Sequence, residues 1–152
     1  MSSDFYQTLN RQAQALLQGE DDLVAAMANF SALINDTLED LNWVGFYLLK
    51  NEQLVLGPFQ GKVACTRIAL GQGVCGSAAL ENKTFRVADV HQFSGHIACD
   101  AASNSEIVIP VMSGNSLIAV LDIDSPKLDR FNEIDQIGLE NLVLSLEKAL
   151  FD

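Results

Sequence analysis

Two aspartates at the end of an apolar run are the first residues whose types and spacing could do chemistry. Asp122 and Asp124 stand two positions apart, behind Ile118 and Val120. In an extended strand, residues two apart point to the same face, so both carboxyl groups should project together from one end of that face. The simpler alternative is a solvent-exposed strand end, with residues 124–126 forming an ordinary turn.

A third acid, Glu106, opens the preceding strand-like run, residues 106–112. Residues 113–116 are typical of a hairpin turn, and pairing the two runs across that turn places Glu106 opposite Ile123, within one residue of both aspartates. Carboxylates this close repel one another, so at least one should hold its proton near neutral pH. A carboxylic acid that stays protonated can donate that proton to a substrate oxygen.

The cysteines supply complementary chemistry, because a thiolate is a nucleophile. Cys99 lies between His96 and Asp100 in a segment without a clear period, Cys75 lies where a short helix should begin, and Cys65 lies in a short strand-like segment. A nearby cation or helix N-terminus lowers the pKa of a thiol and makes it reactive. The alternative is that all three cysteines are small buried hydrophobic residues.

Two motifs suggest cofactors that the rest of the sequence does not support. Residues 71–76 read Gly-Gln-Gly-Val-Cys-Gly and match a dinucleotide fingerprint, but that motif needs a parallel strand and a full crossover helix around it. His96 and the cysteines would make a four-ligand zinc set, yet their spacing matches no common zinc module. We therefore expect neither a metal nor an organic cofactor.

The elements that would position these residues have either a helical or a strand period. Helical spacing of apolar residues runs through residues 5–17, 23–38 (with Asp21 or Asp22 as a cap) and about 129–150, with a shorter helix at 71–80. The strand-like runs are 43–50 and 53–59 joined at 51–52, then 64–70, 84–88, and finally 106–112 and 117–124. Residues 89–104 show no period, and a segment of that length in a compact domain is often functional.

Short hairpin connections produce antiparallel strand pairs, and the run at 107–111 is apolar on both faces. The sequence therefore predicts an α+β fold, with a central, mostly antiparallel sheet covered by helices on both faces. We expect one domain over residues 1–152. The amphipathic helices at the two ends could also serve as the contact of a homodimer.

The chain carries 9 basic and 20 acidic residues, for a formal net charge of −11. This excess of negative charge argues against binding nucleic acid through its phosphates. No apolar run reaches the ~18 residues that a membrane span needs, and the first residues do not resemble a signal peptide, so we expect a cytoplasmic protein without membrane contact. In that compartment a framework of structural disulfides is not expected from three cysteines.

Seven short motifs are spread along the chain. In order they are WVGFY at 43–47, LGPFQG at 56–61, GQGVCG at 71–76, DVH at 89–91, GHIACD at 95–100, SEIVIP at 105–110 and LDIDSP at 121–126. Together they resemble the free methionine-(R)-sulfoxide reductases, which are stand-alone GAF-domain enzymes. A GAF domain in general does not need this combination of cysteines and acids.

The resemblance implies that the chain reduces free methionine-(R)-sulfoxide to methionine. It implies that Cys99 is the catalytic cysteine, Cys65 the main resolving cysteine and Cys75 an auxiliary one, with thioredoxin as the external reductant. It further implies that acids engage the sulfoxide and that aromatic residues line the pocket; these residues are Glu106, Asp122, Asp124, Trp43 and Tyr47.

That reaction needs the residue types found above. A thiolate attacks the sulfoxide sulfur, the oxygen gains protons, and a second thiol converts the resulting sulfenic acid to a disulfide. Two other functions would keep the same fold: a GAF module that binds a ligand without turnover, and a thiol redox sensor that reduces no substrate. The first needs no cysteines and the second needs no acid cluster, and measuring methionine formed from free methionine sulfoxide separates the reductase from both.

Overall fold

The structure is a computed structural model that describes residues 1–95 and 102–152. Cys99, with its neighbours His96 and Asp100, lies outside the described residues, so the catalytic role expected for Cys99 stays a prediction. The other seven residues with expected roles are all described.

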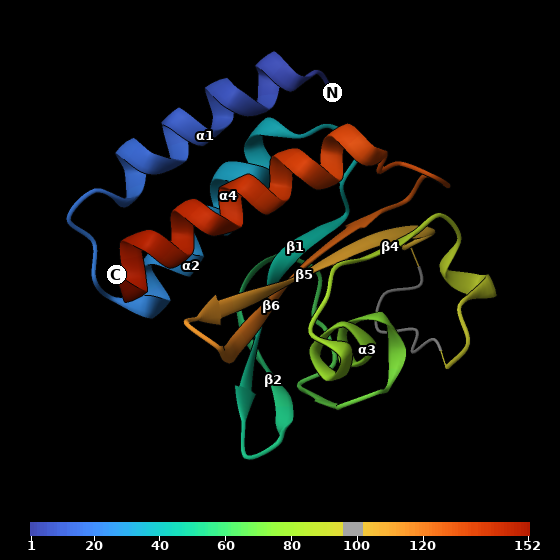
Figure 1. The fold of residues 1–152 in the computed structure, drawn as a ribbon. Coiled ribbons are helices and arrows are strands. Elements are labelled where there is room, and N and C mark those ends of the chain that lie inside the picture. Colours follow the sequence, from blue (N-terminus) through green and yellow to red (C-terminus); the bar gives the residue numbers. More distant parts are fainter. Residues whose placement is uncertain (96–101) are drawn as a thin grey trace.

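A six-stranded sheet forms the centre of the molecule (Figure 1), with every strand pair antiparallel and the order β3-β2-β1-β6-β5-β4. The strands are β1 Trp43–Lys50, β2 Gln53–Gly61, β3 Arg67–Ala69, β4 Phe85–Val87, β5 Ser105–Ser113 and β6 Ser116–Ser125. The two predicted hairpins are confirmed, whereas β3 and β4 are shorter than the runs 64–70 and 84–88 predict. The long segment 89–104 includes a single 3₁₀ turn, Val90–Gln92, among its described residues.

Helices cover both faces of the sheet, as the sequence predicts. On one face lie α2 Leu23–Thr37 and α4 Glu133–Phe151, and α1 Ser3–Leu17 packs outside them against α4; together the three helices bury the larger core. The short helix α3, Gly73–Glu81, lies over the opposite face, where a second core gathers around Trp43, Tyr47 and Cys75 (Figure 1). The described residues with expected roles lie on this side of the sheet.

The last helix begins later than the apolar pattern predicts. Asp129 adopts a left-handed backbone conformation with a φ of 51°, which a helix cannot continue through. Asn132 instead caps α4: its side chain accepts a hydrogen bond from the Asp135 amide, and the Asp135 side chain accepts one from the Asn132 amide. This reciprocal capping box fixes the start of the helix at Glu133.

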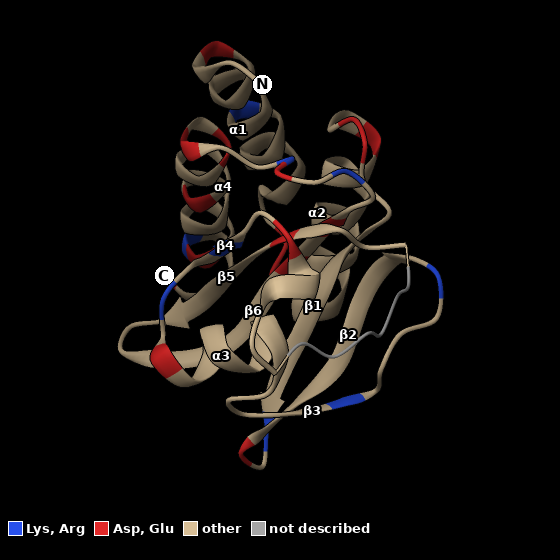
Figure 2. Ribbon diagram, turned by 90° about the vertical axis from the view of Figure 1, so that its right-hand side faces the viewer, with Lys and Arg blue, Asp and Glu red and all other residues tan. Residues whose placement is uncertain are grey.

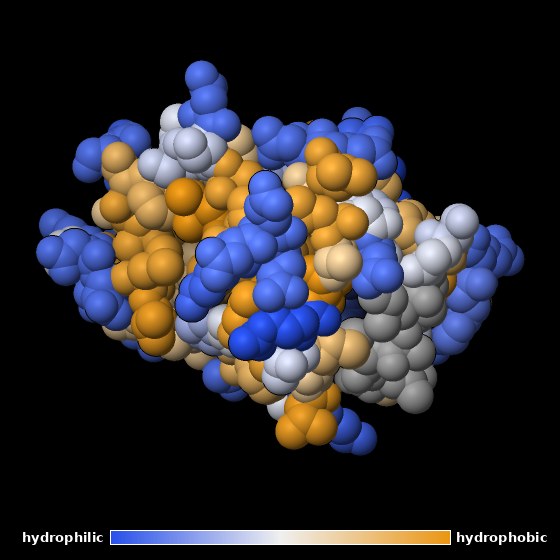
Figure 3. Space-filling view, turned by 90° about the horizontal axis from the view of Figure 1, so that it is seen from below, coloured by the Kyte–Doolittle hydropathy of each residue, from blue (hydrophilic) through white to orange (hydrophobic). Residues whose placement is uncertain are grey.

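The surface on the side of the β1–β2 turn is a mosaic of hydrophilic and hydrophobic residues, and neither kind covers the whole of it (Figure 3). Among the described residues, no helix combines the length and the apolar character that crossing a membrane requires.

Candidate active site

A β-bulge sets the register that brings the acids together. Met112 pairs with Leu117 near the turn, but beyond the bulge Val111 pairs with Ala119, so the register of β5 and β6 shifts by one residue. The pairing of Glu106 with Ile123 expected from the turn alone is therefore wrong. That pairing would have turned Glu106 away from both aspartates, because a slip of one residue moves a side chain to the other face.

The observed register places Glu106 directly opposite Asp124, with Asp122 two residues earlier on the same strand. Opposed residues and residues two apart share a face of the sheet, so the carboxyl groups project into one layer. Figure 2 shows acidic segments of neighbouring strands gathered in the middle of the molecule. Glu106, Asp122 and Asp124 are only 7%, 5% and 8% exposed, so the alternative of a solvated strand end is wrong.

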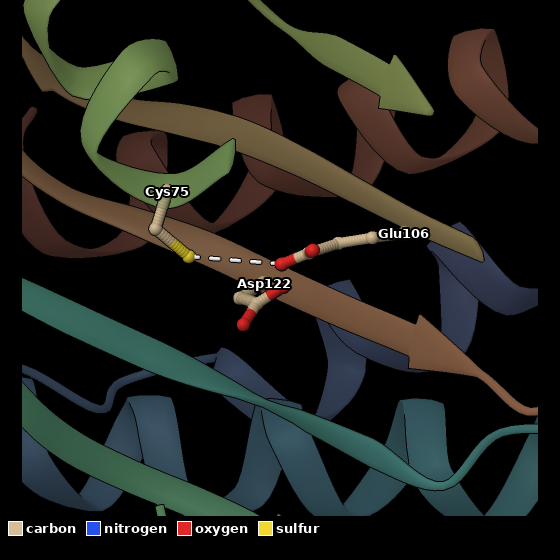
Figure 4. A group of neighbouring side chains, drawn as sticks. All are labelled: Cys75, Glu106 and Asp122. Atoms are coloured by element: carbon tan, nitrogen blue, oxygen red, sulfur yellow. Dashed lines mark hydrogen bonds between the residues drawn. The ribbon is translucent and has the colours of Figure 1, made fainter. Parts of the chain in front are cut away.

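Cys75 meets the acids from the helical layer above them. It lies in the first turn of α3, and its Sγ donates a hydrogen bond to Glu106 Oε2 across 3.9 Å. Figure 4 shows the side chains of Cys75, Glu106 and Asp122 converging, and one ligand atom from each lies within 4.8 Å of the others. Gly76 lets the first turn of α3 pack closely on the end of β3, since a Cβ there would lie 2.4 Å from the Ala69 carbonyl oxygen.

Burial decides the charge state of these groups. Desolvation, followed by the neighbouring Asp122 and Asp124 carboxylates, holds the pKa of Glu106 well above the usual value of 4.5. Desolvation and Asp122 likewise hold the pKa of Asp124 far above its ordinary value of 3.8. The same burial and the three acids raise the pKa of the Cys75 thiol, so Cys75 keeps its proton at neutral pH. At neutral pH, burial therefore favours the protonated forms of Cys75, Glu106 and Asp124.

Two buried carboxylate oxygens in this layer lack a hydrogen-bond partner among the described residues. Ser103 donates a hydrogen bond of 3.2 Å to Asp124 Oδ2, and the Asn42 side-chain amide donates to Ser103 Oγ at 3.0 Å. Asp122 Oδ1 and Asp124 Oδ1 are buried and have no hydrogen-bond partner within residues 1–95 and 102–152. Buried polar atoms are normally paired, so unpaired oxygens mark a place where a ligand or water would bind.

An aromatic stack flanks the acids on β1 and β2. Trp43 pairs with Asp124 in the sheet, and its ring stacks on those of Tyr47 and Phe59 at centroid distances of 5.9 and 5.1 Å. Phe59 packs over Gly45, where a Cβ would lie 2.3 Å from that of Phe59. The site thus combines the three acids with an aromatic wall, the name used below for the stacked rings of Trp43, Tyr47 and Phe59.

The aromatic wall also touches the segment that carries Cys65. The Tyr47 hydroxyl donates a hydrogen bond of 2.9 Å to the Cys65 carbonyl oxygen, and Trp43 Nε1 donates one of 3.1 Å to the Lys62 carbonyl oxygen. These bonds tie the half-buried Cys65 and its neighbours to the wall of the site.

The sequence and the fold have close counterparts among known proteins. The GAF domain profile matches residues 24–150. The chain is 56% identical to the free methionine-R-sulfoxide reductase of Escherichia coli, over 97% of this chain and 90% of that protein. The chain belongs to the free methionine-R-sulfoxide reductase family.

Solved structures agree with this family assignment. The structure of the reduced fRMsr of Staphylococcus aureus superposes with a TM-score of 0.94 and 53% identity, covering 95% of this chain and 94% of that one. The free methionine-R-sulfoxide reductase of Neisseria meningitidis, solved in complex with its substrate, superposes with a TM-score of 0.93 and 42% identity, covering 97% and 89% of the two chains.

Within this family member, the structure brings together Cys75, the three acids, Trp43 and Tyr47, and places Cys65 at the edge of the same layer. Sequence reasoning missed Phe59 and Ser103. Counting from the β1–β2 turn does not find Phe59, because a register shift between Gly45 and Tyr47 is what places it opposite Gly45. Ser103 gave no such signal, since it lies in an irregular segment and reaches Asp124 only through the tertiary fold.

We expect the Glu106→Gln variant to lose less stability than the wild type as pH rises. The raised pKa means that the folded chain holds the Glu106 proton more tightly than the unfolded chain does. This contribution is fully present below 4.5 and is lost as pH rises toward the folded value, by at most about 1.4 kcal/mol per pH unit. Glutamine is neutral at every pH and removes it.

Urea unfolding at acidic and neutral pH measures the difference, and Glu52→Gln in the exposed β1–β2 turn is the matched control. If the free energy of unfolding of the wild type varies with pH no more steeply than that of Glu106→Gln, the raised pKa of Glu106 is contradicted.

Proposed function

We propose that this chain reduces free methionine-(R)-sulfoxide to methionine, with Cys99 as the attacking thiol and the buried acids as the proton source. The observation that carries the proposal is the pair Glu106 and Asp124, two carboxylic acids kept protonated by burial beside unpaired carboxylate oxygens. A sulfoxide oxygen is a poor leaving group until it gains a proton. A buried neutral acid can give that proton at neutral pH.

The proposed first step transfers oxygen from substrate to enzyme. The Cys99 thiolate attacks the substrate sulfur, the sulfur–oxygen bond breaks, and the oxygen leaves on the cysteine as a sulfenic acid after taking up a proton from the acid layer. The substrate sulfur regains its lone pair as methionine. The stack of Trp43 and Tyr47 suits the thioether part of the substrate, because sulfur contacts with aromatic rings are favourable.

Cys75 is less suited than Cys99 to the attacking role. Although its sulfur lies 3.9 Å from Glu106 Oε2, the raised pKa keeps it a thiol, and the thiolate is the reactive form. We assign Cys75 an auxiliary role and Cys99 the attack.

The proposed second step restores the thiol through Cys65. The Cys65 thiol condenses with the sulfenic acid, releasing water and forming a disulfide. A dithiol reductant of the thioredoxin type then reduces the disulfide by exchange. Val63, two residues before Cys65, is 89% exposed, and Lys62 precedes it, so this segment is open to a protein partner.

Replacing Cys65 by serine should separate the two steps. We expect Cys65→Ser to form one methionine per chain at the wild-type rate and then stop when thioredoxin is the reductant, with a fall in steady-state rate on the order of 10²-fold or more. Rapid-quench measurement of the first turnover, followed by steady-state assay, tests this. If Cys65→Ser abolishes the first turnover, the assignment of Cys99 as nucleophile is wrong.

The function itself is tested with purified, reduced protein. The protein is incubated with free methionine sulfoxide and a thiol reductant, and methionine is quantified; parallel reactions contain each sulfoxide epimer and a peptide-bound sulfoxide. We expect methionine from the free R epimer only. A protein that binds the free sulfoxide and forms no methionine from either epimer is a ligand-binding module instead.

Two further proposals concern the setting of the enzyme. A cytoplasmic location fits a cycle that depends on a dithiol reductant, since that compartment keeps thiols reduced.

A homodimer is supported by three exposed apolar residues of α4, Ile134, Ile137 and Leu144. The molar mass in solution decides the second proposal.

A further inference from the structure

We propose that Cys75, Glu106 and Asp122 bind a divalent metal ion of the zinc type, and that this ion blocks the reductase site. The binding stands on the geometry of these three residues alone. The inhibition rests in addition on the proposed function, since it requires that the same acids serve the reduction of the sulfoxide.

The three side chains already converge as a metal site requires. One ligand atom from each, the Cys75 Sγ and a carboxylate oxygen of Glu106 and of Asp122, lies within 4.8 Å of the other two, and all three residues are buried (Figure 4). Typical zinc bond lengths imply a sulfur-to-oxygen separation of about 3.6 Å in a tetrahedral site. The Cys75 Sγ and Glu106 Oε2 are 3.9 Å apart, so this pair needs a shift of only a few tenths of an ångström, while the Asp122 oxygen has to close in from within 4.8 Å.

An unpaired carboxylate oxygen gives independent support for a cation. Asp122 is 5% exposed, and its Oδ1 has no hydrogen-bond partner in the part of the chain that the structure describes. A buried oxygen left without a partner costs free energy, and a bound cation would remove that cost. Glu106 and Asp122 lie on adjacent strands and Cys75 in the first turn of α3, so all three are held by regular structure.

The donor set selects the kind of ion. A thiolate is a soft ligand that Zn²⁺ accepts and that Mg²⁺ and Ca²⁺ avoid in favour of oxygen ligands. Three protein ligands leave the fourth position of a tetrahedral zinc ion open.

Binding must release protons, because a thiol and carboxylic acids coordinate only after deprotonation. Each proton displaced from Cys75 or a carboxyl group passes to solvent as the ion takes its place. Among residues 1–95 and 102–152, the other titratable groups facing the site are Asp124 from β6 and Tyr47 from β1, and the charged groups acting on Cys75 are the three acids. Affinity should therefore rise with pH.

Co²⁺ is the probe for the site, since a thiolate ligand gives it an intense charge-transfer absorption. Reduced protein is treated with a chelator and titrated with Co²⁺ without oxygen. We expect saturation at one ion per chain, displacement of Co²⁺ by Zn²⁺, and tighter binding at higher pH. The band should disappear in Cys75→Ser, and Asp122→Asn should bind at least tenfold more weakly. Asp36→Asn, an exposed change on α2 at the opposite face, should match the wild type.

Two results would overturn the site. The first is an absorption band that survives in Cys75→Ser. The second is an Asp122→Asn variant that binds Co²⁺ as tightly as the wild type. This second test remains valid even if Cys75→Ser does not fold.

The inhibition is measured in a single turnover of pre-reduced protein, because an added dithiol would itself bind the metal. Zn²⁺ should reduce methionine formation, competitively with free methionine sulfoxide, and a chelator should restore it. A protein that binds Co²⁺ through Cys75 but never forms methionine contradicts the proposed function and leaves the metal site standing. Full turnover at Zn²⁺ concentrations that displace the Co²⁺ contradicts the inhibition.

Discussion

Serine at position 99 should leave no methionine formed in the first turnover. In the first step, the Cys99 sulfur bonds to the substrate sulfur, and the substrate oxygen moves onto Cys99. A serine hydroxyl cannot replace it, because it is not ionised at neutral pH and cannot form a sulfenic acid. The rate should fall on the order of 10⁴-fold or more, the scale on which enzymes respond to loss of a nucleophile. Substrate binding should survive, because the acids and the aromatic wall are unchanged.

The experiment mixes stoichiometric free methionine-(R)-sulfoxide with reduced Cys99→Ser and quantifies methionine over time. Cys65→Ser provides the contrast, with one equivalent expected, and Asp36→Asn controls for handling. Cys75→Ser is measured in parallel. If Cys99→Ser yields one equivalent and Cys75→Ser yields none, Cys75 is the nucleophile, and the raised pKa of its thiol would then have to fall when substrate binds.

Much of this fold follows from local rules that the sequence displays. The β1–β2 hairpin is visible in its period of two and its turn, and α2 begins where Asp22 can cap it, with the Asp22 side chain accepting from the Ala25 amide. The start of α4 was predicted too early, because apolar spacing cannot reveal the left-handed backbone at Asp129. Short strands such as β4 depend on pairing with β5, which local sequence does not encode.

The acid cluster shows where sequence reasoning reaches its limit. Period and turn placed Glu106 near the aspartates, but the bulge between Val111 and Met112 decides which face Glu106 occupies. A bulge adds one residue to one strand and leaves no dependable pattern in the sequence. Burial of Asp122 and Asp124 was equally hidden, because a doubly acidic strand end is ordinarily solvated. Among the described elements, α3 packs over β5 and β6 on the face that carries these acids, a tertiary contact that local sequence does not reveal.

Asp124→Asn should lower the rate of the first turnover by about 10²- to 10⁴-fold, the usual contribution of a general acid. Asparagine has the shape of the protonated aspartate but holds no acidic proton to give. Its amide oxygen can still accept the hydrogen bond from Ser103, so the fold should survive. Because the raised pKa keeps Asp124 protonated, wild-type activity should fall as pH rises through that pKa.

Glu106→Gln decides which acid gives the proton, since Glu106 faces Asp124 across the strand pair and its pKa is also raised. Both variants are followed by rapid quench across pH, with Asp36→Asn as the control and urea unfolding to verify the fold. If Asp124 is the donor, Asp124→Asn loses both the rate and the decline of activity with pH, whereas Glu106→Gln keeps the decline. An unchanged rate in Asp124→Asn removes Asp124 from the acid role. A large loss confined to Glu106→Gln transfers that role to Glu106, the acid that already accepts the hydrogen bond of Cys75.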